Sequence, residues 1–399
     1  MKIVPSDVSS RGGKMKYLLL PVVLLLVLSG CGENGHESSS IPDMPVLPVD
    51  TLYIVNEIGV ELGDSTNTFG AITSSIIDRK GRILVLDQVA GCLKVYDQNG
   101  NYIMQVSRQG NGPGELVMPW DMFQMPDGRL MVLDPGKLGF VVFDDSLQFI
   151  EEIALWTQNP PFQGTPVSDN QYAAYKIDTD MVDEKIVMNR RIALYTYGEK
   201  EWDLIFWQDS IEASMNDIIE NPSILIINLL DPLSIGGNGS DRIYFSLKDG
   251  EKYRVTGWDP EGEEILNISM DLDPVEKTEE EIYAESTYVT SYIGRMSGGG
   301  FPMEFEPDPF KDMVIGLDTG PDGNLWVRRG TVDSPFFDIF DSEGTLLHHV
   351  LFPVEGWSWK TSVSQNGILA WEEDPEEGYQ KLFILGMQSD KPEDNQTLP

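Results

Sequence analysis

The sequence predicts an all-β fold: a six-bladed β-propeller of four-stranded antiparallel blades with one helical insertion. Residues 78–103 and 125–150 match in phase at a spacing of 47 residues. Each segment contains short apolar runs that are separated by Gly turns and that end in polar residues. Four short strands in a repeat of roughly 40 to 50 residues are typical of a propeller blade.

The repeat recurs along most of the chain. Further copies cover residues 320–347, 240–265 and 364–385, and a poorly preserved copy consists of residues 171–177 and 190–197. Residues 51–59 form one more apolar run, which we expect to pair with the last blade so that no sheet edge stays open. The predicted blades are residues 66–108, 115–156, 163–208, 232–270, 314–353 and 360–388.

Local patterns explain why these runs are strands joined by turns. Ile83 and Val85 are apolar residues at alternate positions, as expected in a half-buried strand. The run from Asp97 to Gly100 and the one from Asp341 to Gly344 have the form Asp-x-x-Gly. Such runs are hairpin turns, because Gly adopts the positive φ that other residues resist.

A glycine-rich loop, RQGNGPGELVMP, occupies residues 108–119. Such a loop can cradle a phosphate through its backbone N–H groups, or it can let the chain cross from one blade to the next. No predicted helix follows the loop, and the loop itself contains no Lys-Ser or Lys-Thr pair to meet a phosphate. We therefore predict an inter-blade crossover.

The loop and the strands after it resemble the NHL repeat. The resemblance rests on Gly110–Glu115, Pro119, Asp127-Gly128, Val132–Asp134 and Val142–Asp144. Leu116 departs from the pattern, which has Phe there. The chain after residue 30 looks like the bacterial six-bladed, TolB-like propeller lipoproteins, most specifically over residues 70–150 and 314–352. This resemblance implies the same fold as the repeat analysis.

Residues 1–30 are predicted to be a signal peptide. Lys14 and Lys16 precede an apolar run, 17–30, that is shorter than the roughly 20 residues of a membrane-spanning helix. Leu28-Ser29-Gly30-Cys31 resembles the bacterial lipobox, which implies cleavage before Cys31 and acylation of that cysteine with fatty acids such as palmitate. The alternative is a secretory signal with an incidental cysteine. Met15 is an alternative start of the chain.

The regions flanking the propeller are polar. Residues 31–48 have few apolar side chains and no periodicity, as expected of a tether to the membrane. The propeller is predicted to span residues 49–390, and residues 391–399 to form a polar tail. Gly32 is not an aspartate, and by resemblance to lipoprotein sorting this favours the outer membrane of the bacterial cell envelope over the inner membrane.

One insertion, residues 271–313, interrupts the repeats. Residues 274–294 contain the one plausible helix, with Thr278 as N-cap and Glu281 at the capping-box position. A Gly- and Pro-rich loop follows. The insertion can either plug one end of the propeller channel or form a lid that faces a ligand, and both alternatives stay open.

The charge excludes one class of partner. The net charge is −37, and because residues 1–30 carry +3, the chain from Cys31 onward carries −40. Such a surface repels nucleic acids, so we expect no nucleic-acid partner. With Cys31 acylated, Cys92 is the only thiol left, and no intrachain disulfide can form.

The histidines restrict the chemistry. His36 lies in the tether, and His348 and His349 are neighbours whose side chains point to opposite faces of a strand, so a three-histidine zinc site is not expected. No Gly-x-Ser-x-Gly motif is present. A carboxylate and amide site for Ca²⁺ at the channel mouth, similar to that of six-bladed lactonases and arylesterases, remains compatible with so acidic a sequence.

The candidate ligand-binding residues lie mostly in loops after the second strand of each blade. The paired arginines among them can grip a carboxylate or sulfate, or pair with an aspartate of a neighbouring blade. The tryptophan can pack between blades or stack on a sugar. No catalytic residue is predicted. The candidates are Asp87, Trp120, Asp134, Asp249, Arg328, Arg329, Glu372 and Asp374.

Two functions follow as hypotheses. The first is a noncatalytic propeller, anchored to the membrane through its N-terminal lipid, that binds a protein or a glycan with one loop face. The second is a Ca²⁺-dependent hydrolase similar to lactonases and esterases. Propellers serve both as enzymes and as scaffolds, so the fold alone does not decide between the two hypotheses.

Overall fold

A computed structural model describes the part of the chain from Leu47 to Asp390 with short gaps. The described residues are 47–154, 156, 159–214, 216–217, 233–296, 305–330, 336–354, 358–375 and 378–390. The predicted signal peptide, the lipidation site Cys31, most of the tether and the C-terminal tail lie outside them. No helix of the described part is long and apolar enough to cross a membrane.

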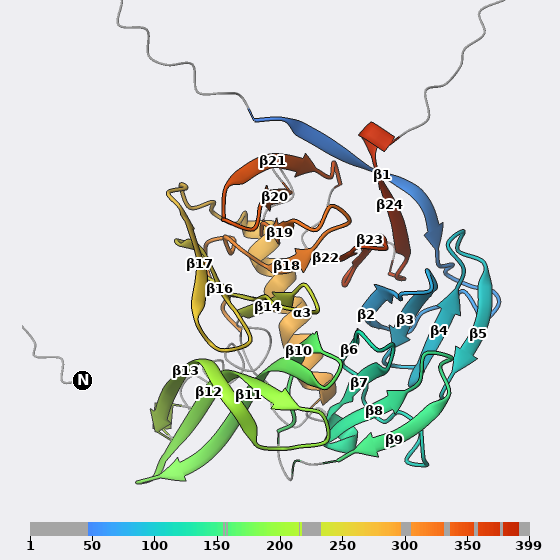
Figure 1. Cartoon of the computed structure of the whole chain (residues 1–399), viewed down its shortest axis with the longest axis horizontal. Coiled ribbons are helices and arrows are strands. Elements are labelled where there is room, and N and C mark those ends of the chain that lie inside the picture. The colour runs from blue at the N-terminus through green and yellow to red at the C-terminus, as the bar shows by residue number, and fades with distance from the viewer. Residues whose placement is uncertain are drawn as a thin grey trace, which may run out of the picture. The chain divides into compact units, whose positions relative to one another are not determined.

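The strands form the six antiparallel blades that the sequence predicts (Figure 1). The first two blades are β2 (Ile72–Ile77), β3 (Ile83–Asp87), β4 (Cys92–Tyr96) and β5 (Tyr102–Val106), then β6 (Asp121–Gln124), β7 (Leu130–Asp134), β8 (Gly139–Phe143) and β9 (Phe149–Ile153). The next two are β10 (Gln163–Ser168), β11 (Gln171–Val182), β12 (Lys185–Thr196) and β13 (Trp202–Ser214), then β14 (Leu233–Gly237), β15 (Ile243–Leu247), β16 (Tyr253–Trp258) and β17 (Glu264–Met270). The last two are β18 (Gly316–Thr319), β19 (Leu325–Arg328), β20 (Phe337–Phe340) and β21 (Leu346–Leu351), then β22 (Trp359–Ser364), β23 (Gly367–Glu372) and β24 (Leu382–Met387) with β1 (Val49–Ile58). The remaining elements are the helix α3 (Glu279–Met296) and the short 3-10 turns η1 (Pro135–Lys137) and η2 (Gln388–Asp390).

The first strand of every blade is the innermost one. Strands β2, β6, β10, β14, β18 and β22 each contact the next in this order, and β22 contacts β2, so the ring is closed. Apolar clusters occupy all six interfaces between blades. Leu84 and Leu93 of the first blade, for example, pack against Leu130 and Val141 of the second. The core is therefore distributed around the ring.

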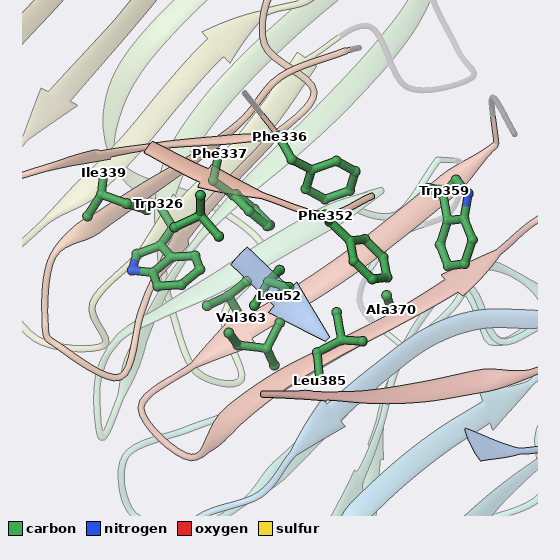
Figure 2. Packing of buried hydrophobic residues seen from close by; sticks show 12 residues of the cluster. Leu52, Trp326, Phe336, Phe337, Ile339, Phe352, Trp359, Val363, Ala370 and Leu385 are labelled. Atoms are coloured by element: carbon green, nitrogen blue, oxygen red, sulfur yellow. The ribbon is translucent and has the colours of Figure 1, made fainter. Parts of the chain in front are cut away.

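Strand β1 closes the ring. It pairs antiparallel with β24, from Leu52 opposite Met387 to Ile58 opposite Leu382, and so supplies the outermost strand of the last blade. This is the pairing that the sequence predicts for residues 51–59. Its first residues also pair in parallel with β21, which joins the last two blades into one eight-stranded sheet. Figure 2 shows Leu52 among the apolar side chains between these two blades.

The Asp-x-x-Gly runs are the turns between the last two strands of the blades. Asp97 accepts hydrogen bonds from the N–H groups of Asn99 and Asn101, both at 2.9 Å, and Gly100 has a φ of +79°. Asp341 makes the equivalent contacts in the fifth blade. In the second blade Leu147 takes the place of the glycine with a φ of +62°, a conformation that costs a non-glycine residue about 1–2 kcal/mol.

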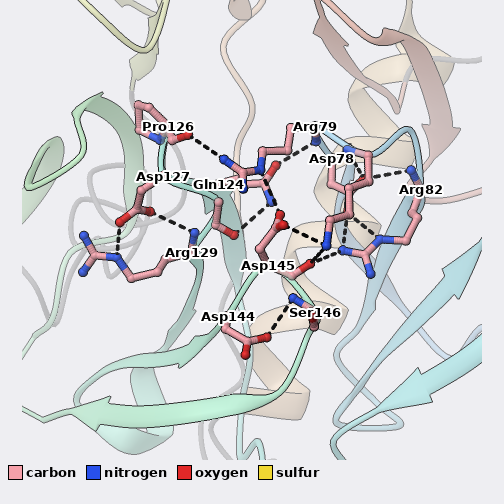
Figure 3. Close-up of polar contacts among 12 residues, drawn as sticks. Asp78, Arg79, Arg82, Gln124, Pro126, Asp127, Arg129, Asp144, Asp145 and Ser146 are labelled. Carbon is pink, nitrogen blue, oxygen red and sulfur yellow. Dashed lines mark hydrogen bonds and ion pairs between the residues drawn. The ribbon is translucent and has the colours of Figure 1, made fainter.

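Arginines after the first turn of three blades link each of these blades to the next. Arg82 pairs with Asp78 at 2.6 Å, and its Nη2 donates to the carbonyl of Asp145 in the second blade at 2.9 Å. Arg129 pairs with Asp127 at 2.7 Å and reaches a carbonyl of the third blade. Figure 3 shows both arginines. Arg242 likewise donates to a carbonyl of the fifth blade at 2.6 Å.

Cys92 is buried on β4, and burial raises the pKa of its thiol to about 11. At pH 8 the reactive thiolate is therefore scarce and shielded. In a Cys31→Ser chain we expect a maleimide to label Cys92 at least about tenfold more slowly in native buffer than in denaturant. Mass spectrometry of timed samples measures both rates, and equal rates would contradict the buried position.

Candidate functional site

The six innermost strands surround a central cavity of about 3120 Å³. The helix α3 and residues 305–309 of the same insertion also line it. In Figure 1, α3 lies across the centre of the ring. The insertion connects the outermost strand of the fourth blade to β18, so α3 covers the end of the cavity at which the innermost strands begin.

The start of α3 has the predicted capping box. The Oγ1 of Thr278 accepts from the N–H of Glu281 at 3.2 Å, and the carboxylate of Glu281 accepts from the N–H of Thr278 at 2.8 Å. These contacts satisfy two backbone donors that a helix start leaves without an intrahelical acceptor. The helix begins at Glu279, five residues later than the expected segment, and runs to Met296.

Polar contacts within the insertion hold α3. Lys311 pairs with Glu281 at 2.8 Å, Lys277 pairs with Glu285 at 2.6 Å, and Ser286 donates to the carbonyl of Phe305 at 2.6 Å. None of the α3 side chains that the structure describes is buried. The helix is therefore a cover that borders the cavity, and the alternatives of a plug and a lid that faces a ligand both stay open.

Hydroxyl and amide side chains form much of the cavity wall. Some of them link neighbouring innermost strands. Ser74 donates to Asp121 at 2.9 Å, and Thr319 donates to the carbonyl of Gly237 at 3.2 Å. The wall therefore offers donors and acceptors to a polar ligand. Other uncharged polar residues of the wall include Thr73, Gln88, Gln124, Gln163, Ser234, Thr361, Ser362 and Asn366.

Aromatic side chains lie around the covered end. Trp120, directly before β6, is half-buried and lines the cavity, and its backbone N–H donates to the carbonyl of Leu133 at 2.9 Å. Aromatic faces can pack on the apolar face of a ligand while polar neighbours bind its hydroxyl groups. Tyr283, Tyr288, Phe305, Trp371 and Tyr379 also line the cavity.

Two aspartates of the wall have raised pKa values. Asp318 lies on β18, and its carboxylate accepts a hydrogen bond from the backbone N–H of Val363 in the next blade. Burial raises the pKa of Asp318 to about 7. Burial also raises the pKa of Asp312, against the opposing effect of Lys248 and Lys277. Among the residues described, no lysine, arginine or histidine forms an ion pair with Asp318.

The raised pKa of Asp318 makes stability depend on pH. The carboxyl group ionises near 3.8 in an unfolded chain and near 7 in the folded chain, so between these values the folded chain binds more protons. Its contribution to stability is present at low pH and is lost as pH rises toward 7. Asp318→Asn is expected to raise Tm by about 2–4 °C at pH 8 and by much less at pH 4.5, measured by thermal melts. An equal shift at both pH values would contradict the assignment.

Five of the eight candidate site residues lie within the blades and do not line the cavity. Asp87 and Asp134 end β3 and β7, and each holds the loop that leads into the innermost strand of its own blade. Asp87 accepts from the N–H of Gly70 at 3.0 Å, and Asp134 accepts from the N–H of Val117 at 2.7 Å. The other three are Glu372, Arg328 and Arg329.

The paired arginines are held inside the fifth blade. The guanidinium of Arg328 lies 3.5 Å from the centre of the Phe336 ring, and burial lowers its pKa to about 9. Arg329 forms two hydrogen bonds with Asp338, at 2.7 and 3.0 Å. The partner of Arg329 is therefore an aspartate of the same blade, where the sequence suggested one of a neighbouring blade.

Three candidates line the cavity at its covered end: Trp120, Asp249 and Asp374. The Oδ1 of Asp249 accepts from the N–H of Glu251 at 2.8 Å and shapes the loop between β15 and β16. The backbone N–H of Asp374 donates to the hydroxyl of Ser358 at 2.9 Å. The sequence pattern missed Asp318, which no repeat motif contains.

Residues that could bind a metal do not converge in the described part of the chain. No group of three or more His, Cys, Asp or Glu side chains there is placed to hold a metal ion. His348 and His349 lie on β21, the outer strand of the fifth blade, and His36 lies outside the described residues. The Ca²⁺ site expected at the channel mouth stays a prediction.

The glycine-rich loop uses its backbone N–H groups internally. The N–H of Gly112 donates to Glu115 at 2.8 Å, that of Gly114 donates to Glu152 at 3.1 Å, and that of Gly110 donates to the carbonyl of Leu116 at 2.9 Å. The loop connects β5 to β6. These contacts agree with the predicted crossover between blades.

Residues 64–223 match the model of a protein family described as a 6-bladed beta-propeller. The chain is a six-bladed β-propeller. Structures similar to this propeller include a member of the DUF4221 family from Bacteroides vulgatus, with a TM-score of 0.48 and 11% identity over 84% of this chain and 98% of that one. They also include a gluconolactonase from Xanthomonas campestris, with a TM-score of 0.43 and 11% identity over 84% and 98% of the two chains. A virginiamycin B lyase from Staphylococcus aureus has a TM-score of 0.40 and 10% identity over 84% and 88%. No curated protein matches the sequence.

Proposed function

We propose that this chain is a lipid-anchored β-propeller of the bacterial cell envelope that binds a glycan in its central cavity without catalysing a reaction. The observation that carries the proposal is the covered, polar and aromatic cavity at the centre of the ring. Its wall combines Trp120 and several tyrosines with many hydroxyl and amide groups, a combination that suits sugar rings.

The size of the cavity favours an extended ligand. Its volume of about 3120 Å³ is several times the roughly 300–1,000 Å³ of a typical small-molecule pocket. An oligosaccharide would fill such a space better than a single metabolite. None of the described side chains of α3 is buried, so this helix covers the cavity without being packed into the core.

The placement of the histidines supports a noncatalytic role. His348 and His349 lie on β21, and the Nδ1 of His349 contacts the buried carboxylate of Asp338 at 2.8 Å. They therefore contribute to the blade and not to the cavity wall. Under this proposal the acidic residues of the wall select a ligand and do not act as general acids or bases.

A glycan array tests the proposal, followed by calorimetry with the best ligand. Trp120→Ala is expected to weaken binding at least about tenfold, because it removes a contact face from the cavity. Trp202→Ala is the matched control, since Trp202 lies on β13 and is 40% exposed. Thermal melts of both variants check that the fold is intact. Ca²⁺-dependent turnover of lactones or esters, with no glycan bound, would favour the hydrolase instead.

The lipid anchor has its own test. Cells that express the full chain are labelled with an alkyne analogue of palmitate, and the protein is detected after coupling to a fluorophore. The chain and a Cys92→Ala variant are expected to carry the label and to fractionate with the outer membrane. Cys31→Ala is expected to lose the label. Undiminished label on Cys31→Ala would contradict the anchor.

A further inference from the structure

The charges on the wall of the central cavity are unbalanced. Among the described residues, eleven Asp and Glu and five Lys and Arg line it. Most of the cations already have carboxylate partners. Arg79 pairs with Asp145, Arg190 with Asp209, Lys277 with Glu285 and Lys360 with Glu373. The cavity therefore has an excess of negative charge and would attract a positively charged ligand.

Of the described carboxylates that line the cavity, Asp318 lies farthest from the cover. It is the last residue but one of β18, and α3 covers the end at which β18 begins. The equivalent position in each blade lies one residue before the last residue of the innermost strand that pairs with the second strand. This residue is Asp318 in the fifth blade, Ile76 in the first and Phe123 in the second. A carboxylate thus replaces an apolar side chain at this level of the ring.

The surroundings of Asp318 leave its charge unbalanced. Its carboxylate accepts from the N–H of Val363, a neutral donor on β22. Thr361 and Ser362 of the same neighbouring strand also line the cavity and can add hydroxyl groups to a ligand that reaches Asp318. In the described chain no cationic side chain pairs with this carboxylate, and an isolated charge in such a place is costly.

We propose that the central cavity takes a ligand that carries a protonated amine, and that the carboxylate of Asp318 is the counter-ion of this amine. The inference rests on the proposed function, because it assigns the ligand class of the same cavity; an amino sugar would satisfy both. An ammonium group has three donors, which one carboxylate and nearby hydroxyl groups can accept. A Ca²⁺ ion would need about six to eight oxygen ligands, and the described carboxylates do not cluster in that way.

The proposal predicts a dependence of affinity on pH. Burial raises the pKa of Asp318 to about 7, so at pH 5 most of the empty cavities hold the neutral acid. Binding of an amine then requires loss of that proton. Affinity should rise with pH by up to about tenfold per unit below pH 7, and should level off above it.

Calorimetry with two small probes tests the proposal on the full chain. The probes are 1,5-diaminopentane and 1,5-pentanediol, which share a chain length and differ in charge. The diamine is expected to bind at least about tenfold more tightly than the diol at pH 8, and more weakly at pH 5 than at pH 8. Asp318→Asn is expected to lose this preference and its pH dependence, while keeping an acceptor for the N–H of Val363.

Asp183→Asn is the matched control. Asp183 lies on the turn between β11 and β12 with a φ of +49°, a conformation that Asn tolerates, and the substitution removes the same unit charge far from the cavity wall. Its affinity for the diamine should equal that of the unaltered chain. A similar loss in both variants would mean that the diamine responds to net charge alone, which would overturn the proposal.

Other outcomes separate this inference from the proposed function. Equal binding of diol and diamine, or unchanged diamine binding by Asp318→Asn, would overturn the inference. If neutral glycans still bound in a way that depends on Trp120, the proposed function would stand without it. If Ca²⁺ bound with an affinity that Asp318→Asn abolishes, while the diamine did not bind, Asp318 would be a metal ligand and the amine assignment would be wrong.

Discussion

Asp338→Ala is expected to lower the free energy of unfolding by about 3–5 kcal/mol, because it leaves the half-buried guanidinium of Arg329 and the buried hydroxyl of Tyr253 without their acceptor. Asp338 is fully buried on β20. Its carboxylate accepts from Arg329 at 2.7 and 3.0 Å and from the hydroxyl of Tyr253 at 2.8 Å, and it contacts the Nδ1 of His349 at 2.8 Å. Because Tyr253 lies on β16, this carboxylate also joins the fourth blade to the fifth.

Urea unfolding of the variant measures the effect. Asp145→Ala is the control, because Asp145 also accepts from two cations, Arg79 and Lys80, but lies at a partly exposed turn. Those cations hold the pKa of Asp145 at about 2, yet water can replace the lost contacts. Asp145→Ala should therefore shift the midpoint far less. Similar shifts for the two variants would contradict the role assigned to the buried cluster.

Gly236→Ala is expected to destabilise the propeller by about 3 kcal/mol and to lower Tm by roughly 5 °C or more. A Cβ atom on Gly236 would lie 2.0 Å from the carbonyl oxygen of Leu317. Gly236 belongs to β14 and Leu317 to β18, which are neighbouring innermost strands. Relief of the clash requires these two backbones to separate, and this opens the ring next to Asp318.

Gly294→Ala is the control for this prediction. A Cβ atom on Gly294 meets nothing within 4 Å, and in a helix alanine is favoured over glycine by about 1 kcal/mol. This variant should be as stable as the unaltered chain or slightly more stable. Differential scanning calorimetry of both variants gives the comparison. A Gly236→Ala chain that melts within 1 °C of the unaltered chain would show that the ring is looser than the structure indicates.

The architecture could be predicted from the sequence because the repeat signals are local. Asp97 and Gly100 mark a turn, since the aspartate caps the backbone and the glycine takes the positive φ. Such signals recur in every well-preserved blade and therefore reveal the period. The sequence does not predict the parallel pairing of β1 with β21, because strands far apart in the sequence meet there without any turn between them.

The candidate site was harder to predict because its key residue, Asp318, does not belong to the repeat. Asp87 and Asp134 stand out in the sequence because they recur in the first two blades, and they recur because each of them holds the start of the innermost strand of its blade. Asp318 carries no motif. The signal that could have found it is a departure from the repeat, a charge where Ile76 and Phe123 stand in other blades. Residues that break a structural repeat are better functional candidates here than residues that keep it.

Hydrogen exchange with and without a bound glycan tests the central claim, that the ligand site is the central cavity, most directly. The full chain is incubated with the tightest ligand of the array, and peptide-level exchange is compared with that of the free chain. Protection is expected in α3 and in the innermost strands, β18 and β22 above all. Protection confined to outer strands such as β5 and β9, with the innermost strands and α3 unchanged, would contradict the claim.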